Sequence, residues 1–186
     1  ATITGIPTQT LAITQQPTNG QARMGEGYFV EVIAQGDGLT YQWYFRNADQ
    51  SKYHKASVTE ATYTCKMRDL SNNRRLLCIV KDKYGKTVQT ETVVIRMAAT
   101  IIKQPSDVTI EKGKTVETSV TAVGNDLKYQ WYIKNKSSDK FVKSSITDAT
   151  YTVKMAKKVD GRQAYCVVKD KYGKTVKSTT VRLKMK

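Results

Sequence analysis

Apolar and polar residues alternate along most of the chain, in short segments separated by turn-forming residues. Alternation with a period of two places one row of side chains on a buried face of a sheet and the other in solvent. No segment shows a convincing helical period. In the first half, the pattern predicts strands at residues 29–34, 39–45, 61–67, 76–80 and 87–95, and turns at 36–38 and 82–85. Short strands with closely spaced turns are typical of an antiparallel β-sandwich.

The chain repeats itself once, at a constant offset and without an insertion. Gln16 returns as Gln104, which gives an offset of 88 residues, and residues 80–88 recur letter for letter at 168–176. A repeat that covers the whole chain indicates a duplicated domain. The predicted division is a linker or strand remnant at residues 1–10, a first domain at 11–98 and a second domain at 99–186.

A tryptophan and a cysteine occupy inward positions of two predicted strands in each repeat. Trp43 and Cys78 lie 35 residues apart in the first repeat, and Trp131 and Cys166 take the same places in the second. An inward Trp that faces an inward Cys on a later strand resembles the core of the immunoglobulin fold. The expected fold class is therefore all-β, with two tandem immunoglobulin-like β-sandwich domains and these four residues in the structural core.

Two segments narrow this resemblance. Residues 36–43 read Gly-Asp-Gly-Leu-Thr-Tyr-Gln-Trp and residues 78–85 read Cys-Ile-Val-Lys-Asp-Lys-Tyr-Gly, with a Gln-Pro pair upstream. They look like the Ig-like repeats in surface proteins of Gram-positive gut bacteria. The resemblance covers essentially the whole chain, twice, and it implies an extracellular or cell-surface location and a modular protein that is not an enzyme.

Each repeat departs from antibody-type domains in two places. Val30 and Thr118 stand where the first cysteine of the inter-sheet disulfide would be, and Leu76 and Ala164 replace the tyrosine that lies two residues before the second cysteine. Neither repeat can form the usual bridge. Each domain must therefore be stabilised by burial of its core, in which a Trp contributes up to about 5 kcal/mol.

The residues that could carry chemistry are few. The chain has three cysteines without a Cys-x-x-Cys pair and one histidine, His54, in a polar stretch. This set favours no metal site, no cofactor and no catalytic triad. Cys65, whose counterpart is Val153, is interpreted as a small core residue, with a disulfide to Cys78 as the alternative.

Asp82 and Asp170 precede Lys-Tyr-Gly at a predicted hairpin turn, where an Asp side chain can accept hydrogen bonds from the following amides. A Tyr and its flanking lysines at the tip of such a hairpin could contact a partner. The identical sequence in both repeats also fits a turn that is kept because the fold needs it. The candidate contact residues are Tyr84, Lys83, Tyr172, Lys171 and Lys174.

Positive charge is concentrated in the second repeat. Residues 1–98 hold 12 Lys/Arg against 8 Asp/Glu, whereas residues 99–186 hold 19 against 8, and the chain carries a net charge of +15. Such a surface attracts a host or cell-wall polyanion, or it is simply a solvated surface. The chain has no arginine-rich helix or aromatic RNA-binding motif, so nucleic acid is not favoured as a partner. No apolar run approaches the ~20 residues that cross a bilayer.

These observations leave two functions from different classes. The leading hypothesis is a monomeric, non-catalytic spacer or adhesive module of a bacterial surface protein, whose partners include other domains of the same protein. The alternative is an adhesin whose basic second domain binds an anionic glycan or cell-wall polymer. No nucleophile, base and oxyanion donors can be assembled from the sequence, so an enzyme ranks third.

Overall fold

The computed structural model describes residues 8–186 and is built almost entirely of β-strands. The chain separates into two compact units, the first ending at Met97 and the second beginning at Ala98. Of the linker or strand remnant expected at residues 1–10, residues 1–7 lie outside the described residues. Among the described residues, no helix has the length and apolar content that crossing a membrane requires.

From residue 8 onward, where the structure describes the chain, the first unit contains ten strands and one turn of 3-10 helix. The strands are β1 Ala12–Gln15, β2 Gly20–Ala22, β3 Gly27–Glu31, β4 Ile33–Gln35, β5 Thr40–Arg46, β6 His54–Lys55, β7 Thr62–Lys66, β8 Arg74–Lys81, β9 Thr87–Gln89 and β10 Val93–Met97, and the helical turn η1 is Asp69–Ser71.

The second unit repeats this order strand by strand. Its strands are β11 Thr100–Lys103, β12 Val108–Ile110, β13 Thr115–Ser119, β14 Thr121–Val123, β15 Lys128–Lys134, β16 Val142–Lys143, β17 Thr150–Lys154, β18 Gln163–Lys169, β19 Thr175–Lys177 and β20 Val181–Met185.

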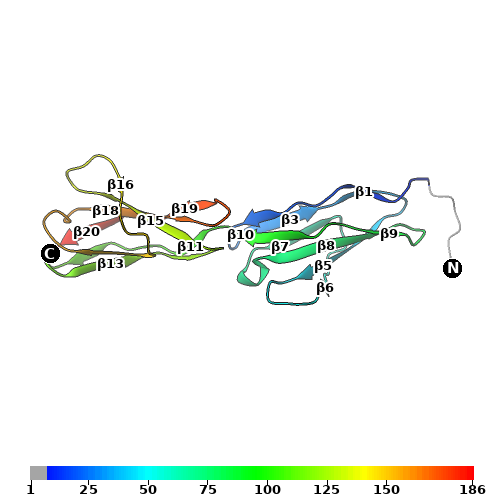
Figure 1. The fold of residues 1–186 in the computed structure, drawn as a ribbon, viewed down its shortest axis with the longest axis horizontal. Coiled ribbons are helices and arrows are strands. Elements are labelled where there is room, and N and C mark those ends of the chain that lie inside the picture. The colour runs from blue at the N-terminus through cyan, green and yellow to red at the C-terminus, as the bar shows by residue number, and fades with distance from the viewer. Residues whose placement is uncertain (1–7) are drawn as a thin grey trace. The chain divides into compact units, whose positions relative to one another are not determined.

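Each unit is a sandwich of two layers (Figure 1). In the first unit, one layer is a six-stranded sheet in the order β2-β10-β8-β5-β6, with β9 also paired to β8. The other layer consists of the pairs β1–β4 and β3–β7. The second unit has the equivalent order β12-β20-β18-β15-β16, with β19 on β18. Strand pairs are antiparallel except β2 with β10 and β12 with β20, which are parallel.

Two predicted strands are interrupted, each for a local reason. The segment 29–34 divides at Val32, whose N–H donates to the carbonyl of Ala61, because the strand changes partner there from β7 to β1. The segment 87–95 divides at Thr90, whose hydroxyl accepts a hydrogen bond from the N–H of Cys78 at 2.9 Å in place of a backbone carbonyl. The sequence pattern missed β1, β2 and β6, which are too short to show an alternation.

The tryptophan of each unit lies between the two layers and is fully buried. Trp43 is directly opposite Cys78 in the β5–β8 ladder, and its ring centroid lies 5.7 Å from that of Tyr63 on the facing sheet. The indole N–H donates to the carbonyl of Glu60 at 2.8 Å, so its polar group is satisfied. Trp131 is likewise fully buried and lies opposite Cys166.

No disulfide joins the layers in either unit. Val30 fills its position as a buried apolar side chain, whereas the hydroxyl of Thr118 donates to the carbonyl of Ser106 at 2.9 Å. Both residues therefore occupy the place of a cysteine without leaving a buried polar group unpaired.

An arginine, buried in the second unit and half-buried in the first, links three segments of each domain, and the sequence reasoning missed it. In the second unit, Arg162 donates from Nε to Asn135 at 2.8 Å and from its terminal nitrogen to the hydroxyl of Tyr151 at 2.9 Å. Arg74 makes the equivalent bonds in the first unit. All three residue types recur at the offset of 88 residues, which is the signal that could have identified the cluster.

Candidate binding surface

The aspartates of the two hairpins hold their turns, as the sequence predicted. One carboxylate oxygen of Asp82 accepts hydrogen bonds from the N–H groups of Tyr84 and Lys86, both at 2.9 Å. Gly85 has a φ of 92°, a left-handed conformation that glycine adopts without strain. Asp170 forms the same turn, and its second oxygen also accepts the N–H of Ala99 at 3.1 Å.

Four of the five residues expected to contact a partner already interact with neighbouring side chains of their own domain. The ammonium groups of Lys83 and Lys171 lie 5.1 Å and 5.4 Å from the ring centres of Tyr84 and Tyr172. Lys171 also pairs with Asp126 at 3.0 Å, and this hydrogen bond and charge raise the pKa of the lysine. Lys174 is exposed. Recruitment of these five residues by a partner stays a prediction.

All three cysteines are free thiols, so the alternative of a Cys65–Cys78 disulfide is wrong. Cys65 lies half-buried on β7, and Cys78 lies on β8 in the other layer. Burial raises the pKa of Cys78 and of Cys166 to about 11, and it raises the pKa of Cys65 as well. The three thiols therefore stay protonated near neutral pH, which makes them poor nucleophiles.

Thiol labelling checks this arrangement. At pH 8 a thiol with a pKa of about 11 is ionised in roughly one molecule in a thousand, so we expect Cys78 and Cys166 to react only when their domains open. Cys65 should react first with a chromogenic disulfide reagent, and three thiols should be counted in denaturant. A count of one in denaturant without reductant would contradict the free-thiol state.

His54 lies on the short edge strand β6, and its side chain is exposed. Its ring centre is 5.8 Å from that of Phe45, the residue opposite it in the ladder. Within residues 8–186, no group of three or more His, Cys, Asp or Glu side chains is arranged to hold a metal ion.

The outer surface of the six-stranded sheet of the second unit is strongly basic. We call it the basic face, and it is formed by the outward side chains of β15, β16, β18, β19 and β20. These strands contain no Asp or Glu. Their seven cations are Lys128, Lys134, Lys143, Lys169, Lys177, Arg182 and Lys184. All except the half-buried Lys134 are exposed, and among the described residues none of the seven forms an ion pair.

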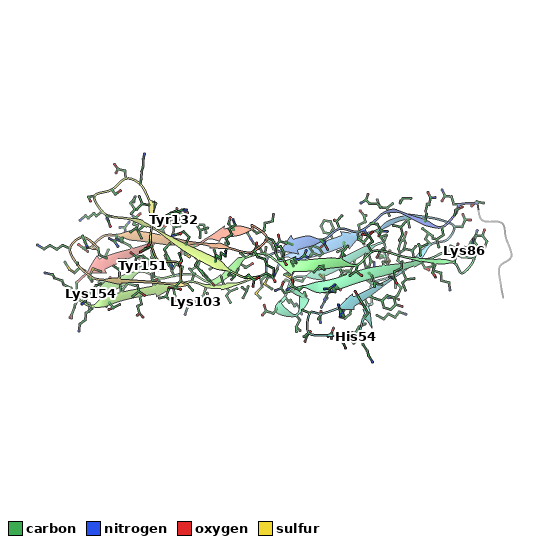
Figure 2. The ribbon with its side chains drawn as sticks, in the orientation of Figure 1. His54, Lys86, Lys103, Tyr132, Tyr151 and Lys154 are labelled. Carbon is green, nitrogen blue, oxygen red and sulfur yellow. The ribbon has the colours of Figure 1, made fainter. Side chains whose placement is uncertain are left out.

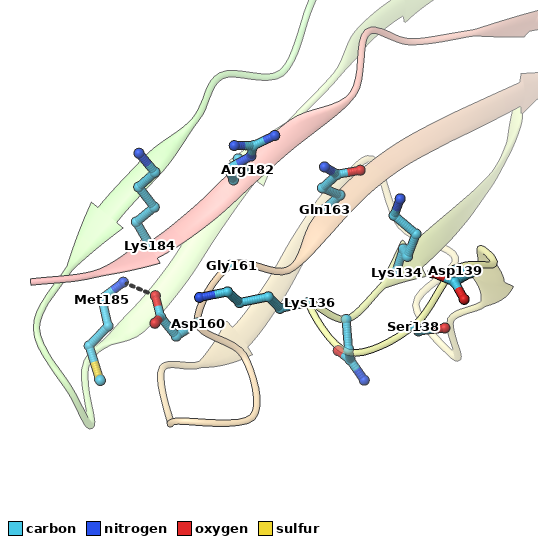
Figure 3. A pocket seen from close by; sticks show the side chains of 11 residues that line it. Lys134, Lys136, Ser138, Asp139, Asp160, Gly161, Gln163, Arg182, Lys184 and Met185 are labelled. Atoms are coloured by element: carbon cyan, nitrogen blue, oxygen red, sulfur yellow. Dashed lines mark hydrogen bonds between the residues drawn. The ribbon is translucent and has the colours of Figure 1, made fainter.

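Two of the hollows on the basic face lie toward opposite ends of β15. The first is lined by Lys134, Lys136, Gln163, Arg182 and Lys184, together with the edge carboxylates Asp139 and Asp160 (Figure 3). Asp160 accepts the N–H of Met185 at 2.9 Å, a bond that joins the loop before β18 to the end of β20. The stem of Lys136 passes close to Gly161, where a β-carbon would lie 3.1 Å from it. A larger residue at 161 would displace this lysine.

The second hollow is lined by Lys128, Lys143 and Lys169, together with Gln130 and Tyr132. Between the two hollows, Tyr132 and Tyr165 stack on each other with ring centres 5.1 Å apart and an interplanar angle of 11°. The basic face therefore has a cation cluster at each end and an aromatic stack in the middle.

The same face of the first unit is a weaker version of this arrangement. It has five outward cations, Arg46, Lys55, Arg75, Lys81 and Arg96, and its strands also lack acidic residues. At the offset of 88 residues, Thr40 stands for Lys128, Gln89 for Lys177, Val94 for Arg182 and Ala48 for Lys136. Leu77 replaces Tyr165, so the aromatic stack is particular to the second unit.

Comparison with solved structures identifies the fold of the two β-sandwiches. The chain superposes on extracellular domains 3–5 of Drosophila OTK with a TM-score of 0.57 and 18% identity, over 96% of this chain and 62% of that one. The N-terminal four Ig domains of a Dscam1 isoform superpose with a TM-score of 0.58 and 14% identity, over 95% and 46% of the two chains. The fold of both units is immunoglobulin-like.

These comparisons show the fold of the chain and do not show its function. The chain spans less than two thirds of the length of these two structures, and its identity to both is low. No family model matches the sequence, and no curated protein matches it. The expected fold class, two tandem immunoglobulin-like β-sandwiches, is confirmed. Function must be argued from the surfaces of the two domains, because one fold serves many functions.

Proposed function

We propose that this chain is a non-catalytic extracellular module, acting as a spacer or adhesive part of a bacterial cell-surface protein. The observation that supports it most is that buried polar groups of the second domain serve the fold. Arg162, Asp170 and the indole N–H of Trp131 each have a partner within their own domain. The bacterial assignment rests on the resemblance of residues 36–43 and 78–85 to surface-protein repeats.

Surface labelling of the organism that produces the protein tests this function. We expect an antibody against the two-domain chain to stain intact cells, and brief proteolysis of intact cells to remove the signal. Staining that requires permeabilised cells would contradict a surface location. The isolated chain should be a monomer. Light scattering during size-exclusion chromatography should give a mass of 20.9 kDa.

A second candidate function is favoured by the distribution of charge. The second domain, residues 98–186, holds 19 basic and 8 acidic residues, and seven of its cations share one sheet face. We propose that this domain binds an anionic glycan or a cell-wall polymer. Binding should weaken steeply as salt is added, because each ionic contact releases counterions from the polymer. Failure of the whole chain to be retained on any polyanion column at low salt would exclude it.

A further inference from the structure

The outward side chains of β15 and β18 form four cross-strand pairs along the basic face. In order, they are Lys128 with Lys169, Gln130 with Val167, Tyr132 with Tyr165, and Lys134 with Gln163. The first and last pairs are six residues apart, or about 20 Å at ~3.4 Å per residue. The row is therefore long, which suits an extended polymer better than a compact ligand.

One pair in this row is unfavourable for the free protein. Lys128 and Lys169 are directly opposite each other, both are exposed, and neither has an acidic partner among the described residues. Like charges in this position destabilise a sheet. The first domain has Thr40 opposite Lys81 at the same place and avoids the repulsion. A ligand anion between the two lysines would replace this repulsion with two attractive contacts.

The flanking cations extend the row on both sides. Lys143 on β16 borders the hollow that contains Lys128 and Lys169. Arg182 and Lys184 on β20 border the hollow at the opposite end (Figure 3). Both ends of the row can thus contact anionic groups, and a ligand that carries its anions at intervals can reach the two hollows at once.

The middle of the row indicates the class of polymer. Tyr165 stacks on Tyr132, the ammonium of Lys177 lies 3.9 Å from its ring centre, and the Phe141 ring is tilted against it at 4.8 Å. Its faces are therefore covered, whereas single-stranded nucleic acid is held by bases that stack on open aromatic faces. The phenol hydroxyls can instead exchange hydrogen bonds with sugar hydroxyls.

The predominance of lysine over arginine on the basic face also favours a polymer with spaced anionic groups. Six of the seven cations on the basic face are lysines, which act as compact point charges. Arginine predominates where a carboxylate or phosphate is held by two parallel hydrogen bonds. Lysines on an exposed sheet face suit anions that are spaced along a chain and need no fixed angle of approach.

From these observations, we infer that the second domain binds a linear sulfated glycan along β15 and β18, with sulfate groups at the cations of the two hollows and sugar hydroxyls at the phenol groups of Tyr132 and Tyr165. This inference rests on the second candidate function and adds to it a location and a ligand class.

A pair of charge-matched double variants of the whole chain tests the location. K128Q/K169Q removes the opposed pair from the basic face, and K103Q/K154Q removes two exposed lysines from the other layer, on β11 and β17 (Figure 2). The probe is a heparin octasaccharide, titrated calorimetrically at about 0.15 M salt. We expect K128Q/K169Q to weaken binding about tenfold or more, and K103Q/K154Q less than about twofold.

Each outcome decides one of the claims. Equal weakening by both double variants would refute the basic face as the site but leave polyanion binding intact. No binding of the octasaccharide or any other polyanion by the wild type would refute the candidate function itself. Tighter binding of hyaluronan, polyglycerol phosphate or oligo-dT than of the octasaccharide would refute the sulfated class.

A ligand-free measurement provides an independent test. Because K128T recreates the Thr–Lys pair of the first domain, it should raise the melting temperature of the second domain at low salt, with the gain shrinking as salt is added. A lower melting temperature at low salt would contradict repulsion between Lys128 and Lys169.

Discussion

Replacing Trp131 with alanine should unfold the second domain and leave the first domain folded. The indole is fully buried between the two layers, contacts Tyr151 with ring centres 5.5 Å apart, and donates to the carbonyl of Asp148 at 2.9 Å. Removal of a buried Trp costs about 3–5 kcal/mol, which is comparable with the whole stability of a small domain. Near-UV circular dichroism during thermal unfolding should show that one of the two transitions is lost.

Trp43 provides the matched control for this experiment. W43A should remove the transition of the first domain and preserve that of the second, because the indole has the same surroundings at the offset of 88 residues. Sharp, wild-type melting of both variants would show that the indoles are not what holds the layers together.

The second large effect is expected at Asp170. Its carboxylate accepts three backbone N–H groups, from Tyr172 and Lys174 at 2.9 Å and from Ala99 at 3.1 Å, and its side chain is buried. D170A would leave these donors without their acceptor, at a cost of about 2–4 kcal/mol. Urea unfolding of the second domain should shift to a lower midpoint by the corresponding amount.

D170N separates the turn from the contact with Ala99. An asparagine keeps one oxygen for Tyr172 and Lys174 but places an amide donor opposite the N–H of Ala99, so its cost should be smaller than that of D170A. Equal midpoints for D170A and the wild type would mean that the hairpin is held by its backbone alone.

The sequence predicted the fold because its strongest signals are local and occur twice. Trp43, Cys78 and the alternation around them identified the two central strands of the sandwich, and the repeat extended the assignment to the second domain. Edge strands such as β2 and β6 escaped detection because two or three residues cannot display an alternation. The interruption at Thr90 was also hidden, since it depends on a side-chain hydrogen bond from a neighbouring strand.

The candidate surface was predicted only as an excess of charge. Counting lysines located the basic character in residues 99–186 but did not show that seven cations share one face. That grouping depends on the ladder that sets Lys128 beside Lys169 and Tyr132 beside Tyr165, and register is a tertiary property. The sequence instead predicted a contact at Tyr84 and Tyr172, because each lies beside lysines at the tip of a hairpin, and the two hairpins have identical sequences.

The unbridged cores carry a consequence for where these domains can fold. With Val30 and Thr118 in the cysteine positions and three free thiols, neither sandwich needs an oxidase or a disulfide isomerase to reach its native state. Anaerobic surroundings rich in sulfide or other reductants leave such a module intact, whereas a bridged antibody domain exposed to them would lose about 2–5 kcal/mol of stability.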